Sequence, residues 1–332
     1  MIELLLLYPV AASALMLSFR KRAINRIALG GYAIVCAVCA LTIASGTDIP
    51  SIIPAFRMFF VLDDLNRLFF YVMTIVFAGS VIASHRFLSR SADGRWDTIY
   101  SVCMMLFVCA MNGVMFSAHL GLFWVFIEAT TLASSVLIYY ERSRAALEAT
   151  WKYIFVCSIG IAFAFVGIIM LTIGAKGSDS LFFSDLSPNM PYLSPFWVKM
   201  GFVFLLTGFG TKVGLAPVHA WKPDAYSEAP SPVAAMLSGA LSNAALIGII
   251  RVVMLMNDAG LGVFAKKLLL FMGIFSVGLA ALFMLRARNY KRLLAYSSVE
   301  HMGIIAIGIS LGGVALFAAM LHVTAHALTK SA

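Results

Sequence analysis

An acidic residue stands in the middle of a strongly apolar stretch of the chain. Glu128 lies in the segment GLFWVFIEATTLASSVLIYY, close to the centre of a helix expected at 119–140. An ionisable group at the centre of a membrane helix costs at least about 2.5–3.5 kcal/mol unless it is paired or hydrated. Because no packing need places a glutamate among phenylalanine, tryptophan and isoleucine, we interpret Glu128 as a proton site or counter-ion. The alternative is a structural carboxyl that hydrogen-bonds a neighbouring helix.

A lysine is followed by a proline in a second apolar stretch, FLLTGFGTKVGLAPVHAW, where Lys212 precedes Pro217 by five residues. Pro217 lacks the N–H group that would bond the Val213 carbonyl, and Gly214 loosens the same stretch. The pattern predicts a discontinuous helix with a free carbonyl beside a lysine, an arrangement that transporters use at ion sites. The alternative is a lysine that snorkels at a helix end. If the helix continues to about 223, Lys212 is central and snorkelling is not expected.

Four histidines lie in or near apolar segments of the C-terminal third, and these are His219, His301, His322 and His326. A single histidine in such a place usually serves packing, but four together suggest a polar file that passes protons. The four-residue spacing of the last two also suits metal ligands. No carboxylate or cysteine completes such a set, so we predict no metal site.

Two further groups of polar residues have a structural interpretation. Glu148 and Lys152 are four residues apart on one helix face, where an ordinary ion pair and a role in a proton path remain equally open. Trp221, Pro223 and Asp224 are expected to terminate the broken helix. The sequence has no glycine-rich nucleotide loop, no Walker lysine and no nucleophile elbow. It therefore indicates no soluble catalytic apparatus.

The composition explains which elements must position these residues. Of 332 residues, 62% are hydrophobic and 12% are charged, whereas a soluble domain is about half apolar and a quarter charged. This excludes a soluble globular enzyme, a disordered chain and a disulfide scaffold. A membrane-spanning helix needs about 20 apolar residues. The hydropathy pattern predicts ten or eleven such helices, at 2–19, 27–45, 65–84, 98–117, 119–140, 147–174, from about 196, 232–256, 265–285, 297–311 and from about 313. The longest loop is expected at 175–195.

The distribution of basic residues predicts the orientation. The net charge of +9 is typical of a nucleic-acid partner only in a soluble protein, and we expect no nucleic acid here. One set of loops holds most of the basic residues, and these are Arg20, Lys21, Arg22, Arg26, Arg86, Arg90, Arg95, Arg142, Arg144, Lys222, Arg286, Arg288, Lys291 and Arg292. The positive-inside rule places this side in the cytoplasm. The chain is then a multi-pass protein of the inner (cytoplasmic) membrane with its N-terminus outside.

Taken together, these residues resemble the antiporter-like membrane subunits of respiratory complex I. The same superfamily includes the Mrp cation/proton antiporters and the membrane arm of energy-converting nickel–iron hydrogenases. The resemblance rests on Glu128, on Lys212 and on the motif P-x-H-x-W-x-P-D-A-x-x-x-A-P that starts at Pro217. The segment RNYKRLLAYSSVEHMG at 288–303 also matches the family's K-R-x-x-A-Y-S-S motif. Several details are most similar to hydrogenase-4 component F, namely EATWKY at 148–153, WKPDAYSEAP at 221–230, Glu300 before His301 in SSVEHMG, and HALTKS at 326–331.

The resemblance implies an all-α fold of two inverted five-helix repeats, each with a discontinuous helix. Family members have about fourteen helices, so the ten or eleven predicted here indicate a fragment that stops inside the eleventh. The expected division is N-terminal helices at 1–97, a first repeat with the broken helix at 98–256, and the start of a truncated second repeat at 257–332.

The resemblance also implies roles for particular residues. Glu128 and Lys212 would form a coupled pair, and His301 and His326 would be relay positions on a central polar axis. The proton path would also include His219 and Lys330.

Asn243 departs from the family pattern, because many complex I subunits have a lysine there. An asparagine can hold water but cannot carry a proton. We therefore expect a histidine to supply the missing group, and His301 is the best candidate because it directly follows Glu300 at the expected cytoplasmic start of a helix. Glu300 and His322 are further possible members of the path. The alternative is that Glu300 and His301 only anchor the helix end.

The function that the resemblance implies is a proton-translocating subunit of an energy-converting redox complex, of hydrogenase-4-like or complex I-like type. Such a subunit is not catalytic itself and is expected to hold no cofactor. Its partners would be other membrane subunits, a peripheral redox arm and the lipid bilayer. The alternatives are a subunit of an Mrp-type Na⁺/H⁺ antiporter, and a non-conducting anchor for a peripheral hydrogenase arm.

Overall fold

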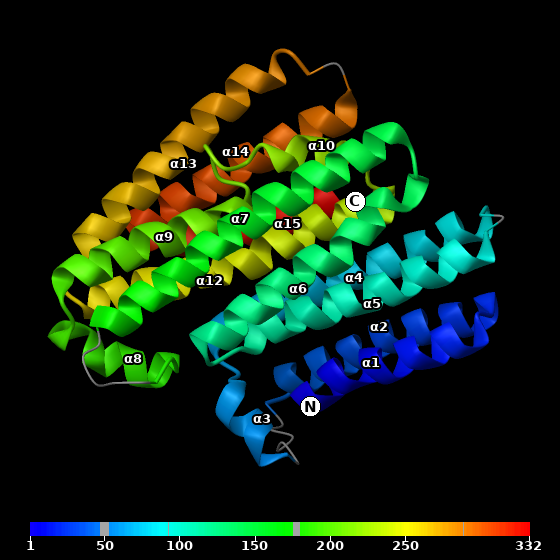
Figure 1. The fold of residues 1–332 in the computed structure, drawn as a ribbon, viewed down its shortest axis with the longest axis horizontal. Helices are drawn as coiled ribbons and strands as arrows, with labels where there is room; N and C mark the ends of the chain where they lie inside the picture. The colour runs from blue at the N-terminus through cyan, green and yellow to red at the C-terminus, as the bar shows by residue number, and fades with distance from the viewer. Residues whose placement is uncertain (47–52, 92, 175–179, 288) are drawn as a thin grey trace.

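The computed structural model describes residues 1–46, 53–91, 93–174, 180–287 and 289–332. Arg288 and the first part of the loop expected at 175–195 lie outside these described residues. Within them the chain is built from helices that run roughly along one axis (Figure 1). The predicted all-α, multi-pass membrane fold is confirmed, whereas the division of the chain at residues 98 and 257 stays a prediction.

Ten helical segments of the described chain are long and apolar enough to cross a membrane. They are α1 (Ile2–Phe19), α2 (Arg22–Ala44), α4 (Asp64–Ser89), α5 (Gly94–Phe116), α6 (Leu120–Ile138) with η1 (Tyr139–Glu141), α7 (Arg144–Gly174), α9 (Pro195–Val213), α11 (Ser231–Met236) with η3 (Leu237–Leu241) and α12 (Ser242–Asp258), α13 (Gly262–Met284) and α14 (Tyr290–Leu311). An eleventh long helix, α15 (Val314–Ser331), follows them. The number of helices agrees with the prediction from hydropathy.

Four short elements connect the long helices. They are α3 (Pro54–Phe59), α8 (Phe183–Asn189), the 3₁₀-turn η2 (Met190–Tyr192) and α10 (Trp221–Glu228). The segment predicted as a loop at 175–195 therefore contains α8 and η2. The helix expected from about 196 does not continue to about 223 but ends at Val213, and α10 is a separate element that begins at Trp221.

Polar side chains fix several helix ends. Asp63 precedes α4 and accepts a hydrogen bond from the backbone N–H of Asn66 at 2.8 Å, which satisfies a donor that the first helical turn leaves free. Arg251 of α12 donates to the other carboxylate oxygen of Asp63 at 2.8 Å. This pair ties the start of α4 to the latter part of α12.

Glycines allow two pairs of helices to pack closely. A Cβ atom added to Gly208 of α9 would lie 2.6 Å from the Gly160 carbonyl of α7. A Cβ added to Gly303 of α14 would lie 2.8 Å from the Gly273 carbonyl of α13. Membrane helices associate through such close backbone contacts, because lipid is as apolar as the side chains and gives little hydrophobic driving force.

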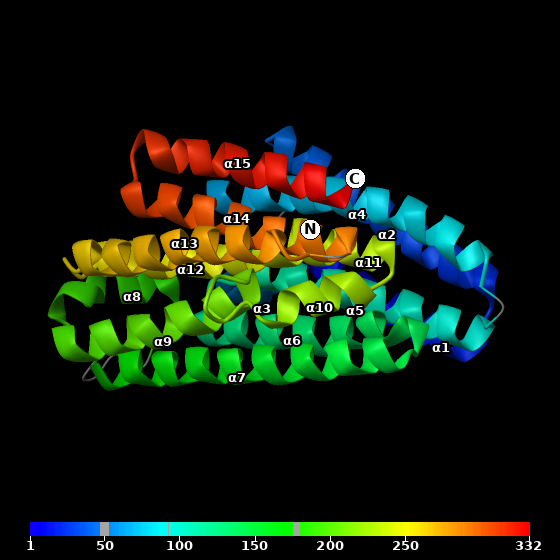
Figure 2. The same ribbon diagram turned by 90° about the horizontal axis from the view of Figure 1, so that it is seen from above.

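The short helix α10 lies between two layers of long helices. It packs against α7 on one side and against α14 on the other, and Figure 2 shows it between the α6–α7 layer and the α13–α14 layer. The helices α14 and α15 pack together, and α15 also contacts α4. Side chains of α10 are therefore placed to connect the two halves of the described chain.

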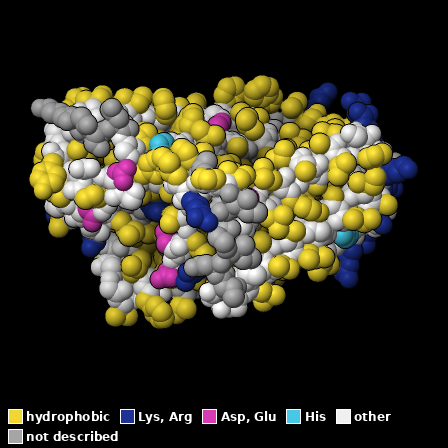
Figure 3. Space-filling view, turned by 90° about the horizontal axis from the view of Figure 1, so that it is seen from below, with side chains coloured by type: hydrophobic (Ala, Val, Ile, Leu, Met, Phe, Trp, Pro, Cys, Tyr) yellow, Lys and Arg dark blue, Asp and Glu magenta, His cyan; other side chains and the backbone are white. Residues whose placement is uncertain are grey.

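The outer surface is what a membrane-embedded chain requires. Hydrophobic side chains cover much of the face in Figure 3, and Lys and Arg gather at one end. That end contains the turn between α1 and α2, as comparison with Figure 1 shows. Large apolar side chains are widely exposed, including Ile27, Leu41 and Phe271. The basic cluster at one end agrees with the distribution on which the predicted orientation rests.

Candidate functional site

The break between α9 and α10 leaves backbone carbonyls that side chains satisfy. Gly214 ends α9 in the left-handed region with φ of 82°, a conformation that favours glycine. The indole Nε1 of Trp221 donates to the Thr211 carbonyl at 2.8 Å. The Nζ of Lys222 donates to the Val213 carbonyl at 2.8 Å. The carbonyl predicted to be freed by the proline thus has a lysine as its partner.

Lys212 is fully buried on the last turn of α9, with 0% of its surface exposed. Its Nζ donates to the Tyr153 hydroxyl of α7 at 3.0 Å and lies 5.0 Å from the centre of the Tyr153 ring. The same hydroxyl hydrogen-bonds the Ser134 hydroxyl of α6 at 2.6 Å. Lys212, Tyr153 and Ser134 are therefore connected by hydrogen bonds, and each of these groups can both accept and release a proton.

Glu128 is half-buried in the middle of α6. Its carboxylate accepts hydrogen bonds from Ser158 of α7 at 2.7 Å and from Thr131 at 3.3 Å. The ion pairs among the described residues do not include Glu128 and Lys212, although the two charges interact electrostatically. The predicted pair is thus not in direct contact, and polar groups of α7 hydrogen-bond each partner.

Lys222 is a functional candidate that the sequence interpretation missed. It was counted among the basic loop residues, but it lies on α10 and is 0% exposed. Its Nζ is 5.5 Å from the centre of the Tyr226 ring. The charge also interacts electrostatically with Lys330 and with His326. The signal that could have identified it is its place in the break, within reach of the carbonyl that the proline leaves free.

Trp221 does not terminate a helix as predicted, but begins α10. Its ring contacts that of Tyr153, with centroids 5.0 Å apart, and that of Tyr226, with centroids 6.0 Å apart. An aromatic row of Tyr153, Trp221 and Tyr226 therefore connects the tyrosine beneath Lys212 with the tyrosine beneath Lys222.

Three of the four histidines form one cluster between α14 and α15. His301 Nδ1 and His322 Nε2 are 2.9 Å apart, and the rings of His301 and His326 have centroids 5.6 Å apart. His326 Nε2 is 3.1 Å from the Ser298 hydroxyl. The fourth, His219, lies in the connection between α9 and α10, and its ring packs near Phe283.

The position predicted for His301 is wrong. The helix expected to start at about 297 begins at Tyr290, so His301 lies in the middle of α14 and not at its first turn. Its hydrogen-bond partner is His322 and not the preceding Glu300, because adjacent residues on a helix do not face each other. Lys330 of α15 donates to the Ser297 hydroxyl at 2.8 Å and interacts electrostatically with Glu300.

Glu148 and Lys152 do form an ion pair, with 2.6 Å between Glu148 Oε1 and Lys152 Nζ. Lys152 also lies 3.0 Å from a carboxylate oxygen of Asp224, whose other oxygen lies 2.8 Å from Arg292. Asp224 of α10 is therefore held by a cation of α7 and a cation of α14. This arrangement fixes the position of α10 between its two neighbours.

Asn243 is buried near the start of α12, directly after the π-helical turn η3. Its Nδ2 donates to the Gly239 carbonyl at 2.8 Å, while its Oδ1 is buried without a partner in the described chain. A π-turn inside an α-helix often marks a functional position. The Leu237 carbonyl of this turn accepts a hydrogen bond from the Tyr226 hydroxyl at 2.8 Å.

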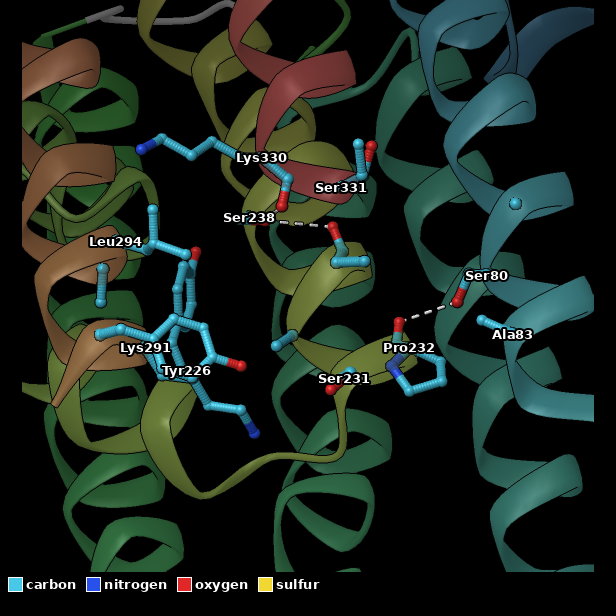
Figure 4. Close-up of a pocket in the computed structure, with 16 residues that line it drawn as sticks. Ser80, Ala83, Tyr226, Ser231, Pro232, Ser238, Lys291, Leu294, Lys330 and Ser331 are labelled. Atoms are coloured by element: carbon cyan, nitrogen blue, oxygen red, sulfur yellow. Dashed lines mark hydrogen bonds between the residues drawn. The ribbon is translucent and has the colours of Figure 1, made fainter. Parts of the chain in front are cut away.

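A cavity of about 280 Å³ lies between α4, α11, α14 and α15. Figure 4 shows Tyr226, Lys291 and Lys330 among its lining residues, with a hydrogen bond from Ser80 to the Pro232 carbonyl. Because Tyr226 forms part of the wall, the cavity reaches the residue on which Lys222 rests. Among the described residues, no group of three or more histidine, cysteine or acidic side chains is placed to hold a metal ion.

Comparison with known proteins gives consistent relatives. The chain is 38% identical over 285 residues to the hydrogenase-4 component F homolog of Methylacidiphilum infernorum, which covers 82% of this chain and 60% of that protein. It is 29% identical over 266 residues to NADH-quinone oxidoreductase subunit N of Desulforudis audaxviator, which covers 79% of this chain and 51% of that protein. The chain thus spans about half to three fifths of the length of these relatives.

A solved structure shares the fold over nearly the whole chain. A chain of the membrane-bound sulfane sulfur reductase, an archaeal respiratory membrane complex, matches with a TM-score of 0.89 and 26% identity, covering 99% of this chain and 69% of that one. Residues 117–332, which include the helix break, both lysines and the histidine cluster, match the family described as NADH:quinone oxidoreductase/Mrp antiporter, transmembrane. The protein is therefore a multi-pass membrane protein that belongs to the NADH:quinone oxidoreductase/Mrp antiporter family.

Proposed function

We propose that the chain is a proton-translocating membrane subunit of an energy-converting redox complex. The observation that carries the proposal is the fully buried Lys212 at the helix break, whose ammonium donates to the Tyr153 hydroxyl. An intramembrane ionisable residue is costly to hold in place, and such residues mark ion and proton pathways. The break supports this role, because irregular backbone at membrane depth is tolerated where it is buried in protein or lines a water-filled cavity.

The proposed path has two parts. The first runs from Glu128 past the polar groups of α7 to Lys212, with His219 beside the break. The second is the histidine cluster of His301, His322 and His326, with Lys330 and Glu300 toward its end.

Glu148, Lys152 and Asn243 are assigned supporting roles. The first two belong to the ion-pair group that holds α10 through Asp224. Asn243 can orient a proton or a water molecule through its unpartnered Oδ1, but it cannot itself be protonated at neutral pH.

The proposed partners and location follow from the relatives and the charge distribution. Hydrogenase-4 and NADH-quinone oxidoreductase, the complexes for which the relatives are named, favour a peripheral redox arm and further membrane subunits as partners. Electron transfer would then occur outside this chain, which would hold no redox centre. The basic end would face the cytoplasm in the inner membrane, with the N-terminus outside.

The experiment measures proton flux per electron in inverted membrane vesicles that contain the assembled complex. Variants replace the chromosomal copy of the gene, and hydrogen, formate and NADH are tried as electron donors. Lys212→Met should lower proton flux at least tenfold while assembly is kept. The control is Lys199→Met on the same helix, where the lysine is half-buried over the Phe264 ring at 5.6 Å and lies at the other end of α9. This variant should stay within twofold of wild type.

The same vesicles separate the proposal from its alternatives. A non-conducting anchor predicts an unchanged proton-to-electron ratio in Lys212→Met. An Mrp-type antiporter predicts sodium-dependent proton movement that persists without any electron donor. Either result would overturn the proposed redox-driven proton transfer.

A further inference from the structure

Lys222 is a buried cation that the path through Lys212 does not use. It has no exposed surface, and the ion pairs among the described residues give it no carboxylate partner within 4.0 Å. Removing an ammonium group from water costs several kcal/mol, which an ion pair of good geometry can offset. Lys222 is buried without such a pair among the described residues, so the cost of burying it suggests a function for this side chain.

The backbone of the break is shaped around the stem of this lysine. A Cβ atom added to Gly214 would lie 2.5 Å from Lys222 Cδ and 3.1 Å from its Nζ. The absence of a side chain at Gly214 therefore lets the lysine reach across the break to the Val213 carbonyl. The contact between Lys222 and the Val213 carbonyl is therefore a buried, closely packed interaction that depends on Gly214.

A row of proton-exchanging groups begins beside Lys222 and leads away from Lys212. The Tyr226 hydroxyl interacts with the Ser298 hydroxyl, which is 3.1 Å from His326 Nε2. His326 packs against His301, whose Nδ1 is 2.9 Å from His322 Nε2. We call these five residues the hydroxyl–imidazole file. Each hydroxyl and imidazole can accept a proton on one side and release one on the other.

We propose that Lys222 is a second proton-carrying lysine, which connects the helix break to the hydroxyl–imidazole file. This inference rests on the proposed function of the chain and adds a residue to its path. The Lys222 ammonium gives one proton to the file and becomes a neutral amine, and a proton from the side of Lys212 restores the ammonium. The flexible four-carbon stem allows the amine to move from the Val213 carbonyl across the Tyr226 ring to its hydroxyl.

Lys222 also supplies the proton-carrying group that Asn243 cannot provide. The two residues are linked through Tyr226, whose hydroxyl contacts the Leu237 carbonyl and lies 3.3 Å from the Ser242 hydroxyl, next to Asn243 in the chain. The electrostatic interactions of Lys222 with Lys330 and His326 are between groups that all carry positive charge when protonated. A proton that arrives on one of them therefore favours release from another.

A purely structural cap is the competing role for Lys222. A cap needs only a hydrogen-bond donor, and the chain already uses the indole of Trp221, which does not titrate, for the Thr211 carbonyl. Lys222→Gln keeps a neutral donor, and Lys222→Met removes the donor at nearly the same length. A cap role predicts that the glutamine variant conducts and the methionine variant does not. Proton carrying predicts that both lower proton flux at least tenfold.

The experiment compares these variants with Lys222→His and Lys212→Met in the same vesicles, with proton flux per electron measured from pH 5.5 to 8.5. Lys222→His should retain part of the flux, with its pH profile displaced to lower pH by about one unit or more, because a histidine exchanges protons at lower pH than a lysine. A structural cap has no reason to displace the profile. Lys199→Gln is the matched control and should stay within twofold of wild type.

The outcomes separate this inference from the proposed function. If Lys212→Met abolishes flux but both neutral Lys222 variants conduct normally, only the inference fails. If Lys212→Met conducts normally, the proposed function fails as well. If the Lys222 variants do not assemble, Ser298→Ala decides, since it removes one small hydroxyl from the file. It should lower flux at least threefold, and an unchanged flux would overturn the inference.

Discussion

The two buried lysines beside the helix break have similar surroundings but different partners. Each is 0% exposed, and each ammonium lies over a tyrosine ring, at 5.0 Å for Lys212 and 5.5 Å for Lys222. Lys212 donates to a hydroxyl, which can pass a proton on. Lys222 donates to a backbone carbonyl, which can only accept. Lys212 interacts electrostatically with Cys157 and Glu128, whereas the charge that acts on Lys222 is that of Lys330. The charge of Lys222 acts in turn on His326 and His219.

The difference shows that two lysines with the same burial can differ in chemistry through their hydrogen-bond partners and nearby charges. The opposite charge of Glu128 acts on Lys212, whereas burial and, to a smaller extent, the like charge of Lys330 disfavour the Lys222 ammonium. In the proposed path, this difference separates a lysine that holds a proton from one that releases it. The comparison can be tested at Gly214, at Tyr153 and Tyr226, at His301 and at the ion pairs of Asp224.

The largest effect is expected from Gly214→Ala. The residue has φ of 82°, and a Cβ would lie 2.5 Å from Lys222 Cδ. The left-handed backbone costs about 1–2 kcal/mol for a residue with a Cβ, and overpacking adds about 1–3 kcal/mol. Thermal unfolding in detergent should show a loss of stability of about 2–5 kcal/mol, the sum of these two contributions.

Gly260→Ala is the matched control for this variant. Gly260 has φ of 71°, but a Cβ there would meet no atom within 4 Å. It should lose only the backbone part, about 1–2 kcal/mol. If the two alanine variants lose equal stability, Lys222 does not fill the space beside Gly214. The double variant Gly214→Ala, Lys222→Ala should recover the packing part of the loss.

A second test compares the two tyrosines. Tyr153→Phe removes the one hydrogen bond that the described residues give to the Lys212 ammonium. It should lower proton flux at least tenfold, and it should lower stability by about 1.5–3 kcal/mol, since hydrogen bonds to charged groups are worth about that much. Tyr226→Phe leaves the bond from Lys222 to Val213 intact. Tyr226→Phe should lower proton flux several-fold and should lower stability less than Tyr153→Phe does. Equal losses of flux and stability in the two variants would contradict the comparison.

The sequence was sufficient to predict the Lys212 side of this comparison. A glutamate and a lysine inside long apolar segments are conspicuous, and Pro217 determines where a helix must lose a hydrogen bond. The number of long helices also follows from hydropathy alone. The sequence could not show that Glu128 and Lys212 are not in direct contact, because the distance between α6 and α9 side chains depends on how both helices pack against α7.

The Lys222 side was missed for a physical reason. The segment around it is polar in sequence, with Lys222 and Asp224 flanking a proline, and hydropathy therefore assigns it to a loop. Only the tertiary placement of α10 between α7 and α14 buries it. The start of this helix, and with it the place of His301, was mispredicted because polar residues at 290–298 lower the hydropathy of a segment that is nonetheless helical. Buried polar sites are where hydropathy is least informative.

A third, smaller effect is expected at the far end of the file. His301→Gln should lower proton flux about threefold, because it interrupts the contact between His322 and His326 while an amide can still orient water. Glu300→Gln should change flux less, because His322 and not Glu300 is the partner of His301. Flux measured in paired vesicle preparations checks the order, and a larger effect for Glu300→Gln would restore the carboxylate as the functional partner of His301.

The smallest effect is expected from the ion pairs that position α10 for both lysines. Asp224 is 17% exposed and binds Lys152 of α7 and Arg292 of α14, whose side chains are 48% and 46% exposed. Pairs this open to solvent contribute about 0.2–1 kcal/mol each, so Asp224→Asn should lower stability by less than about 2 kcal/mol. Glu148→Gln removes only the more exposed contact to Lys152 and should change stability by less than about 0.5 kcal/mol.

The effect of Asp224→Asn on the two lysines should also differ. Lys212 lies on α9, which packs directly against α7 and does not depend on the ion pairs of α10. Lys222 lies on α10 itself, so looser attachment of α10 weakens its bond to Val213 and not that of Lys212 to Tyr153. In Asp224→Asn, raising the salt concentration should therefore have little further effect on stability, whereas in the wild type it should weaken these exposed pairs. An Asp224→Asn variant that keeps the wild-type salt dependence would show that α10 is held by packing alone.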